Sequence, residues 1–194
     1  MLTCSQFWEW FLSHEREIWA MEHQDEALMD DIAAALRARC GAGLGFEVSD
    51  ERDGARELII TAMSDPSLFD AVDEIVAEAP SLSQWRFIAL KPPRGFGFTF
   101  DGDGVHLEPN TMVFEPLRSE TKPHALGLRV YVPISNITPA VGAAVRRVVE
   151  IGLGERASSQ IEYIVAATLT GSPSDYIPLV DLSEYIAWAQ KRNR

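Results

Sequence analysis

The sequence has little of what marks a secreted, membrane-bound or cysteine-rich protein. Two cysteines occur in 194 residues, Cys4 and Cys40, too few for a disulfide framework or a cysteine metal cluster. No stretch approaches the roughly 20 uninterrupted apolar residues of a membrane span. The segment Met1–Ser5 lacks the basic and apolar runs of a signal peptide. We therefore expect a cytoplasmic protein with unpaired thiols and no membrane contact.

Basic residues are also scarce, and their distribution is uneven. The chain holds 17 Lys and Arg against 29 Asp and Glu, which gives a net charge of −12. Residues 1–83 contribute 5 − 18 = −13, and residues 84–194 contribute 12 − 11 = +1. Because affinity for nucleic acid and anionic lipid rests on Lys and Arg, this balance argues against both as partners. A basic protein partner is compatible with it.

Familiar catalytic and cofactor motifs are absent from the sequence. His14-Glu15 begins like a zincin helix, but Ile18 stands where the second histidine is needed. The glycine-rich stretch 41–45 follows a predicted helix and precedes a strand, the reverse of the phosphate-binding order. The stretch 101–104, Asp-Gly-Asp-Gly, loses the register of a calcium loop and is typical of a hairpin turn. We accordingly predict no catalytic residue, no cofactor and no metal site.

One string overlaps a nucleic-acid motif. Residues 94–100, Arg-Gly-Phe-Gly-Phe-Thr-Phe, follow the start of the RNP1 pattern, in which aromatic rings stack on RNA bases. Thr99 stands where the pattern needs an aliphatic residue, and Asp101 where it needs an aromatic one. Together with the acidic charge, this favours a twisted edge strand whose glycines permit a bend.

The apolar spacing predicts an α+β protein with a mixed, mainly antiparallel sheet and helices packed on it. The first half is predicted to form two helices, then strand, strand, helix and strand, over residues 7–19, 28–36, 44–48, 57–62, 65–80 and 84–90. The second half is predicted to form a hairpin, two strands, a helix, a strand and a helix, over residues 96–107, 111–117, 126–132, 138–149, 161–169 and 181–188. The order strand-strand-helix-strand thus occurs twice, which raises the hypothesis of a duplication.

Length and composition fit a single domain. Hydrophobic residues make up 46% of the chain and charged residues 24%, an ordinary globular composition. We expect residues 1–194 to form one domain. It can be subdivided into an acidic half with a helical start, 1–90, and a second half, 91–194.

Several short segments carry a resemblance to other proteins. They are Phe7–Leu12, Glu57–Ala62, Asp65, Leu68-Phe69, Val72, Ala79-Pro80, Trp85-Arg86 and Gly154-Glu155. In these segments the chain resembles a set of uncharacterised bacterial proteins that share a domain of unknown function. One departure is the turn Met63-Ser64, which is longer in such proteins. The resemblance implies a compact bacterial α+β protein and supplies no catalytic residues.

The leading functional hypothesis is a non-enzymatic protein-binding or regulatory module. The aromatic stripe of the first helix, which includes Trp8, is either core packing or an exposed partner or homodimer surface. The acidic residues at the start of the second helix would face a basic partner: Asp25, Glu26, Asp30 and Asp31. One version of this hypothesis is an immunity-like protein that neutralises a basic toxin.

The alternative hypothesis is a small-ligand-binding protein or an enzyme with a pocket between the two halves. Its candidate residues are Arg86, Lys91, Arg94, His106 and Glu115. A histidine beside a carboxylate can transfer protons near neutral pH. Distance along the sequence does not establish their geometry, so both hypotheses stay open at this point.

Overall fold

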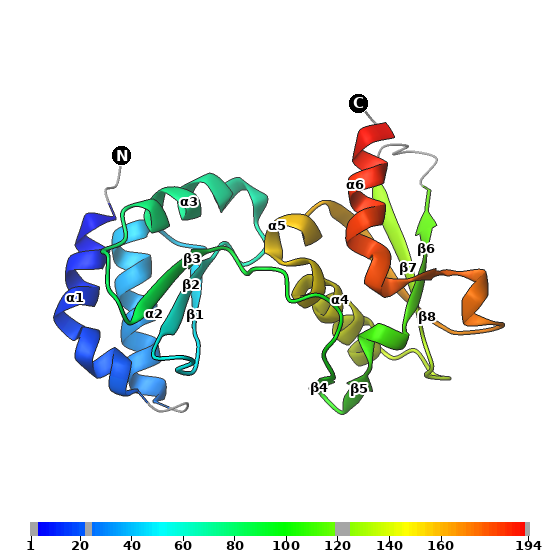
Figure 1. Cartoon of the computed structure of the whole chain (residues 1–194), viewed down its shortest axis with the longest axis horizontal. Helices are drawn as coiled ribbons and strands as arrows, with labels where there is room; N and C mark the ends of the chain where they lie inside the picture. Colours follow the sequence, from blue (N-terminus) through cyan, green and yellow to red (C-terminus); the bar gives the residue numbers. More distant parts are fainter. Residues whose placement is uncertain (1–3, 22–24, 119–124, 193–194) are drawn as a thin grey trace. The chain divides into compact units, whose positions relative to one another are not determined.

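The computed structural model describes residues 4–21, 25–118 and 125–192 (Figure 1). These residues form six α-helices and mixed, mostly antiparallel sheets, which confirms the predicted α+β class with two N-terminal helices. The chain divides into two compact units, unit 1 (Met1–Lys91) and unit 2 (Pro92–Arg194). Unit 1 has a formal charge of 7 − 18 = −11 and unit 2 one of 10 − 11 = −1, so the acidity belongs to unit 1.

Unit 1 begins with two helices that pack against a three-stranded sheet. The helices are α1 (Ser5–Ala20) and α2 (Glu26–Cys40), and α3 (Phe69–Ala77) follows later. The strands are β1 (Gly45–Val48), β2 (Arg56–Thr61) and β3 (Trp85–Ala89), in the order β1-β2-β3. β1 is antiparallel to β2, whereas β3 is parallel to it, so α3 serves as the crossover between two parallel strands.

Aromatic side chains build the core of unit 1. Phe11 meets both Trp85 and Phe87 edge-on, with ring centroids 5.1 and 5.4 Å apart. Trp8 is 3% exposed, and its indole N–H donates a 2.8 Å hydrogen bond to the carbonyl of Ile75. Of the two interpretations of the aromatic stripe, core packing is therefore the one that holds for Trp8. Its burial removes it from the surface that a partner could contact.

A buried arginine caps the C-terminal end of α1. Arg56, 5% exposed, places Nη1 at 3.0, 2.8 and 3.2 Å from the carbonyl oxygens of Ile18, Trp19 and Met21. Its Nε donates to the carbonyl of Ser49 at 2.8 Å. The last carbonyls of a helix have no partner within the helix, so the N–H groups of a cationic side chain placed there satisfy them. The positive charge also interacts favourably with the negative end of the helix dipole.

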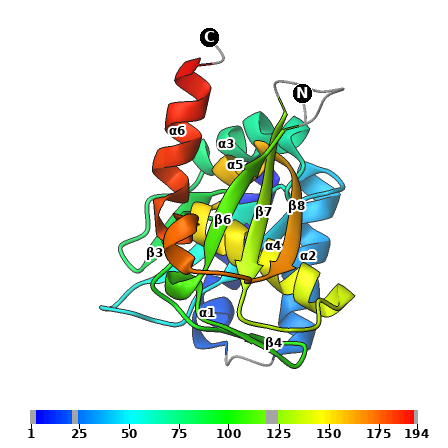
Figure 2. The same cartoon turned by 90° about the vertical axis from the view of Figure 1, so that its right-hand side faces the viewer.

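Unit 2 opens with a hairpin of two short strands, β4 (Phe100–Gly102) and β5 (Val105–Leu107). Its main sheet has the order β8-β7-β6-β9 and consists of β6 (Val113–Leu117), β7 (Leu126–Val132), β8 (Ile161–Thr168) and β9 (Ile177–Pro178). The helices are α4 (Pro139–Leu153), α5 (Glu155–Ser158) and α6 (Leu182–Arg192). Figure 2 shows β6, β7 and β8 side by side, with α4 behind them and α6 beside β6.

The same strand-strand-helix-strand order occurs in both units, as β1-β2-α3-β3 and β6-β7-α4-β8. In each, an antiparallel pair is followed by a crossover helix and a parallel third strand. The third strands end in matching ways: the N–H of Leu90 donates to the carbonyl of Ile60 at 2.8 Å, and that of Leu169 donates to Val132 at 2.9 Å. The predicted repeat is thus present in the topology and in the register.

The two crossover segments also begin alike. The carboxylate of Asp65 accepts the backbone N–H of Ser67 at 2.9 Å, and the hydroxyl of Thr138 accepts that of Val141 at 3.3 Å. A proline follows each cap, at a position where a helix needs no N–H. Both starts were predictable because cap and proline are adjacent in sequence.

The predicted edge strand over residues 94–100 is wrong, because Phe100 alone of these residues lies in a strand. The backbone N–H groups of Arg94 and Gly95 donate to the carbonyls of Ile151 and Gly152 at 3.0 and 3.1 Å. These carbonyls belong to the last turn of α4, where intrahelical donors run out. The segment's donors thus satisfy the end of a helix and not a neighbouring strand.

Phe96 anchors this segment on α4. Its ring lies so close to Gly152 that a Cβ added to the glycine would fall 2.2 Å from a ring carbon. Phe96 is 4% exposed, so its ring is not open to stacking on a base as the RNP1 pattern requires. The string that overlaps a nucleic-acid motif is a helix-end contact.

The hairpin predicted around residues 101–104 is confirmed. Gly102 pairs with Val105, which leaves Asp103 and Gly104 as a two-residue turn. Both have positive φ, 51° and 73°, the conformation that Asp-Gly supplies in tight hairpins.

Candidate functional site

The acidic residues proposed for partner binding lie together on the start of α2. Asp25 caps the helix by accepting the backbone N–H of Leu28 at 3.1 Å, and Glu26, Asp30 and Asp31 are exposed along it. Part of this acidity has a structural role, since negative charge near a helix N-terminus is favourable. These four residues lie within the first two turns of one helix, whereas Trp8, proposed with them, is in the core.

The unit 1 candidates for a ligand pocket each have a glutamate nearby. Arg86 of β3 lies 3.9 Å from Glu57 on the neighbouring strand, and its side chain is largely exposed. Lys91 lies 3.0 Å from Glu47 of β1. Two separate ion pairs on a sheet surface are ordinary and contribute little to stability.

The unit 2 candidates occupy three different places. Arg94 is in the segment that caps α4, described above. His106 of β5 has Nδ1 2.6 Å from a carboxylate oxygen of Asp101 and Nε2 3.9 Å from Glu108. Hydrogen bonding to Asp101, with a smaller contribution from Glu108, raises the pKa of the His106 imidazole. The imidazole is exposed on the hairpin.

Glu115 belongs to a network on the outer face of the unit 2 sheet. One of its carboxylate oxygens accepts from Arg129 at 2.6 Å and from the hydroxyl of Tyr131 at 2.9 Å. Burial is the main cause that raises the pKa of Tyr131, and its ring packs against Tyr176 at 4.3 Å. The network holds neighbouring strands together, and it is separate from His106 and Arg94 within unit 2.

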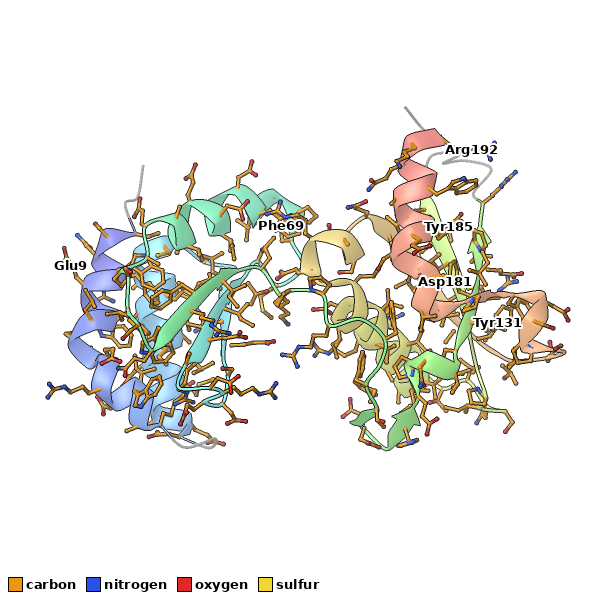
Figure 3. The ribbon with its side chains drawn as sticks, in the orientation of Figure 1. Glu9, Phe69, Tyr131, Asp181, Tyr185 and Arg192 are labelled. Atoms are coloured by element: carbon orange, nitrogen blue, oxygen red, sulfur yellow. The ribbon has the colours of Figure 1, made fainter. Side chains whose placement is uncertain are left out.

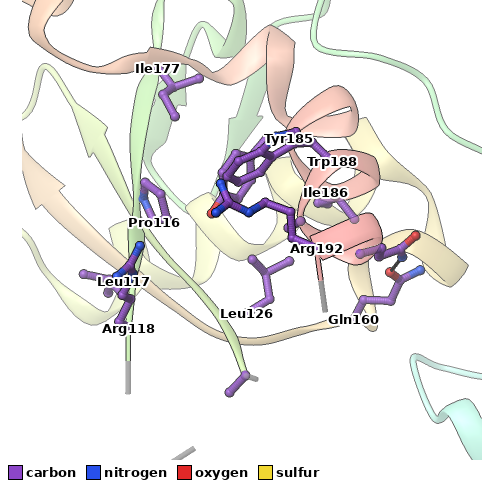
Figure 4. A pocket seen from close by; sticks show the side chains of 13 residues that line it. Pro116, Leu117, Arg118, Leu126, Gln160, Ile177, Tyr185, Ile186, Trp188 and Arg192 are labelled. Atoms are coloured by element: carbon purple, nitrogen blue, oxygen red, sulfur yellow. Dashed lines mark hydrogen bonds between the residues drawn. The ribbon is translucent and has the colours of Figure 1, made fainter. Parts of the chain in front are cut away.

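A hollow of about 830 Å³ lies in unit 2 between α6 and the ends of β6 and β7; we call it the α6 groove (Figure 4). Small-ligand sites commonly enclose roughly 300–1,000 Å³. Its lining side chains come from α6 (Tyr185, Ile186, Trp188, Ala189, Gln190, Arg192), β6 and its end (Pro116, Leu117, Arg118), and from Ala125, Leu126, Gln160 and Ile177.

Tyr185, Trp188 and Arg192 form the α6 wall of the groove, at a spacing that puts them on one face of the helix (Figures 3 and 4). The two rings lie 5.6 Å apart, and the guanidinium carbon of Arg192 lies 4.9 Å from the Trp188 ring centroid. Trp188 is 50% exposed. Burial raises the pKa of Tyr185, while the charge of Arg118 acts in the opposite direction.

The β6 wall presents a strand edge that cannot accept another strand well. The carbonyl of Met112 accepts the N–H of Leu179, so alternate residues from Met112 onward direct their backbone toward the β9 side. β9 pairs with Val113 and Phe114, and β6 continues beyond it. Pro116 then occupies the open edge and has no N–H to donate. A ligand of the groove is therefore expected to bind through side chains.

The chemistry of the lining is that of binding. It offers two guanidinium groups, the hydroxyl of Tyr185, the indole of Trp188, and two glutamines, Gln160 and Gln190, that hydrogen-bond to each other. Among residues 4–21, 25–118 and 125–192, no carboxylate, imidazole or thiol lines this groove. In that same part of the chain, no three His, Cys, Asp or Glu side chains are grouped to hold a metal ion.

Comparisons with known proteins add no name to this site. No protein-family model, curated protein or solved structure matches the chain.

Within the described residues, none of the helices combines the length and apolarity needed to cross a membrane.

Sequence reasoning missed the groove. The apolar spacing of Tyr185 and Trp188 predicts only the buried face of a last helix, and it does not point to Arg118 or Arg192. One signal was available: aromatic residues at 185 and 188 and an arginine four residues later share a helix face. The spacing of apolar residues does not show that β6 lies opposite this face of α6.

Proposed function

We propose that the protein is a non-enzymatic binding module that holds a segment of a partner protein in the α6 groove. The observation that carries this proposal is the composition of the groove walls. Trp, Tyr and Arg are the residue types that dominate the energetics of protein interfaces, and all three line one open hollow here. Burial of an exposed tryptophan and the apolar walls beside it under a partner removes apolar surface from water and so stabilises the complex.

The proposal keeps the cytoplasm as the location, on the scarcity of cysteine. A homodimer stays a prediction that light scattering at several concentrations would test. A small-ligand role is the alternative for the same groove, because its volume also suits a compact organic molecule.

A selection from a random peptide library on the intact chain tests the proposal. Enriched peptides are synthesised, and their affinities are measured for the wild type and for Leu126→Trp, which fills the groove. Val165→Trp, on the exposed outer face of β8, introduces the same side chain away from the groove. We expect at least a tenfold loss of affinity in Leu126→Trp and no change in Val165→Trp. Circular dichroism checks that both variants fold. No enrichment, or equal loss in both variants, would overturn the proposal.

A second candidate function rests on α2. Asp25, Glu26, Asp30 and Asp31 are all exposed on it, and unit 1 carries −11 of the net charge. We propose as the alternative that this helix docks a basic protein, as an immunity-like protein would. Capture of a basic partner from the native host that is abolished by neutralising Glu26, Asp30 and Asp31 would favour it over the groove, and unchanged capture would exclude it.

A further inference from the structure

We infer that the segment bound in the α6 groove is acidic and carries an aromatic or branched apolar anchor residue; this inference rests on the proposed function and names its partner chemistry.

Positive charge reaches the groove from two walls. Arg118 extends from the end of β6, and Arg192 from the last turn of α6 (Figure 4). An arginine in the last turn is an ordinary partner of the helix dipole, so Arg192 alone would carry no meaning. Arg118 follows a different element, β6, and also lines the α6 groove. Asp and Glu make up 29 of the chain's 194 residues, yet none of the lining residues whose position is described is acidic.

The contact between Arg192 and Trp188 leaves the groove able to bind a carboxylate. The guanidinium carbon lies over the indole, 4.9 Å from the ring centroid, and this contact acts through the positive charge without using up the N–H donors as a hydrogen bond would. Those donors match a carboxylate in a two-point hydrogen-bonded pair. The indole also limits the rotamers of the arginine, so less entropy is lost when an anion binds.

The rest of the groove suits an apolar side chain. Three apolar residues, Pro116, Leu126 and Ile186, line the groove, and Ile186 is only 5% exposed. Trp188 is half exposed and offers a ring to a partner residue. Because Pro116 blocks strand addition at the β6 edge, recognition would come from side chains, a carboxylate beside an anchor.

Defined peptides test the inference on the full chain by fluorescence anisotropy. The probe is a labelled Asp-Glu-Phe-Asp-Glu peptide, compared with Asn-Gln-Phe-Asn-Gln and with Asp-Glu-Ala-Asp-Glu. We expect each comparison peptide to bind at least tenfold more weakly, and 0.5 M salt to weaken the acidic probe. The double variant Arg118→Gln, Arg192→Gln should lose the preference for the acidic probe. Arg146→Gln with Arg147→Gln, exposed on α4, removes the same charge and should retain it.

The outcomes separate this inference from the proposed function. If the neutral peptide binds as well as the acidic one, and Leu126→Trp abolishes both, the acidic partner is wrong and the groove still holds protein segments. Neutral or basic consensus sequences from the library selection would lead to the same conclusion. If phenylacetate binds as tightly as the probe and displaces it, the commitment to a protein segment is overturned in favour of a small organic anion. An unchanged preference in the Arg118, Arg192 double variant would overturn the assignment of these two residues.

Discussion

Units 1 and 2 carry the same strand-strand-helix-strand order, but they cover the inner face of its sheet differently. In unit 1, α1 brings Phe7, Trp8 and Phe11 into the core, and each is at most 3% exposed. α2 adds Ile32 and Leu36 to the same core, and both are fully buried. In unit 2, α4 covers the sheet and α6 runs beside β6, so the end of the face opens into the α6 groove. The repeated strand-strand-helix-strand unit therefore sets the sheet. The helices outside this unit, α1 and α2 in unit 1 and α6 in unit 2, determine whether a groove forms beside the sheet.

Matching positions of the two sheets show the same contrast. Counted from the equivalent carbonyls of Ile60 and Val132, Arg56 of β2 corresponds to Leu128 of β7, four residues earlier in each. Leu128 is fully buried in an apolar core. Arg56 is buried because α1 ends over it and supplies three carbonyl acceptors. The same position of the repeated unit thus holds a charged side chain in one sheet and an apolar one in the other, depending on the element that covers it.

The largest predicted difference is between the two indoles Trp8 and Trp188. Trp8→Ala removes a buried ring and a hydrogen bond, so the free energy of unfolding should fall by about 4 kcal/mol. Trp188→Ala removes a half-exposed ring from the groove and should change it by about 0.5 kcal/mol or less. Urea unfolding followed by circular dichroism measures both. Equal losses would mean that α6 is as much a part of its core as α1.

The second prediction compares Arg56→Met with Leu128→Met at the matching positions. Arg56→Met leaves three helix-end carbonyls without their donor and should cost about 3 kcal/mol of unfolding free energy. Leu128→Met conserves volume and should cost less than about 1.5 kcal/mol. Chemical denaturation at neutral pH is the measurement. If Arg56→Met were neutral or stabilising, the arginine would be a replaceable buried charge and not the cap of α1.

Local signals in the sequence predicted most of the frame. The caps Asp65 and Thr138, each followed by proline, and the Asp103-Gly104 turn act through neighbours one to three residues away. Apolar spacing gave the helices and strands because each buries one face. Such features depend on the chain nearby and not on the tertiary arrangement.

Contacts between segments that are distant in the sequence could not be predicted from it. The N–H of Gly95 meets a carbonyl 57 residues later, at Gly152, so local spacing wrongly predicts a strand for its segment. The groove was missed for the same reason: Arg118 and Arg192 are far apart in sequence, and both line the groove only because α6 returns to β6. Burial of Arg56 likewise depends on where α1 ends.

The third prediction tests the segment that caps α4, with two glycines of that helix. Gly152→Ala would place Cβ 2.2 Å from the ring of Phe96, so either the ring or the capping segment must shift, at a cost of about 2 kcal/mol. Gly142→Ala meets nothing within 4 Å and should stabilise the helix by about 0.5–1 kcal/mol. Thermal and urea unfolding of the pair give the sign of each change. A stabilising Gly152→Ala would show that Phe96 does not dock on this glycine.

The smallest effect concerns the β4–β5 hairpin of unit 2, where a charge pair has no buried surroundings to strengthen it. The carboxylate of Asp101, and more weakly Glu108, raises the pKa of His106 above its ordinary value of 6.5. A raised folded-state pKa means that the pair stabilises the fold fully below pH 6.5, and that this contribution is lost as the pH rises through the raised pKa. An NMR titration of the imidazole should show a midpoint above 6.5 that returns toward 6.5 in Asp101→Asn and shifts less in Glu108→Gln. A midpoint that does not respond to Asp101→Asn would mean that the 2.6 Å contact is not populated in solution, because a hydrogen bond that favours the imidazolium must move its pKa.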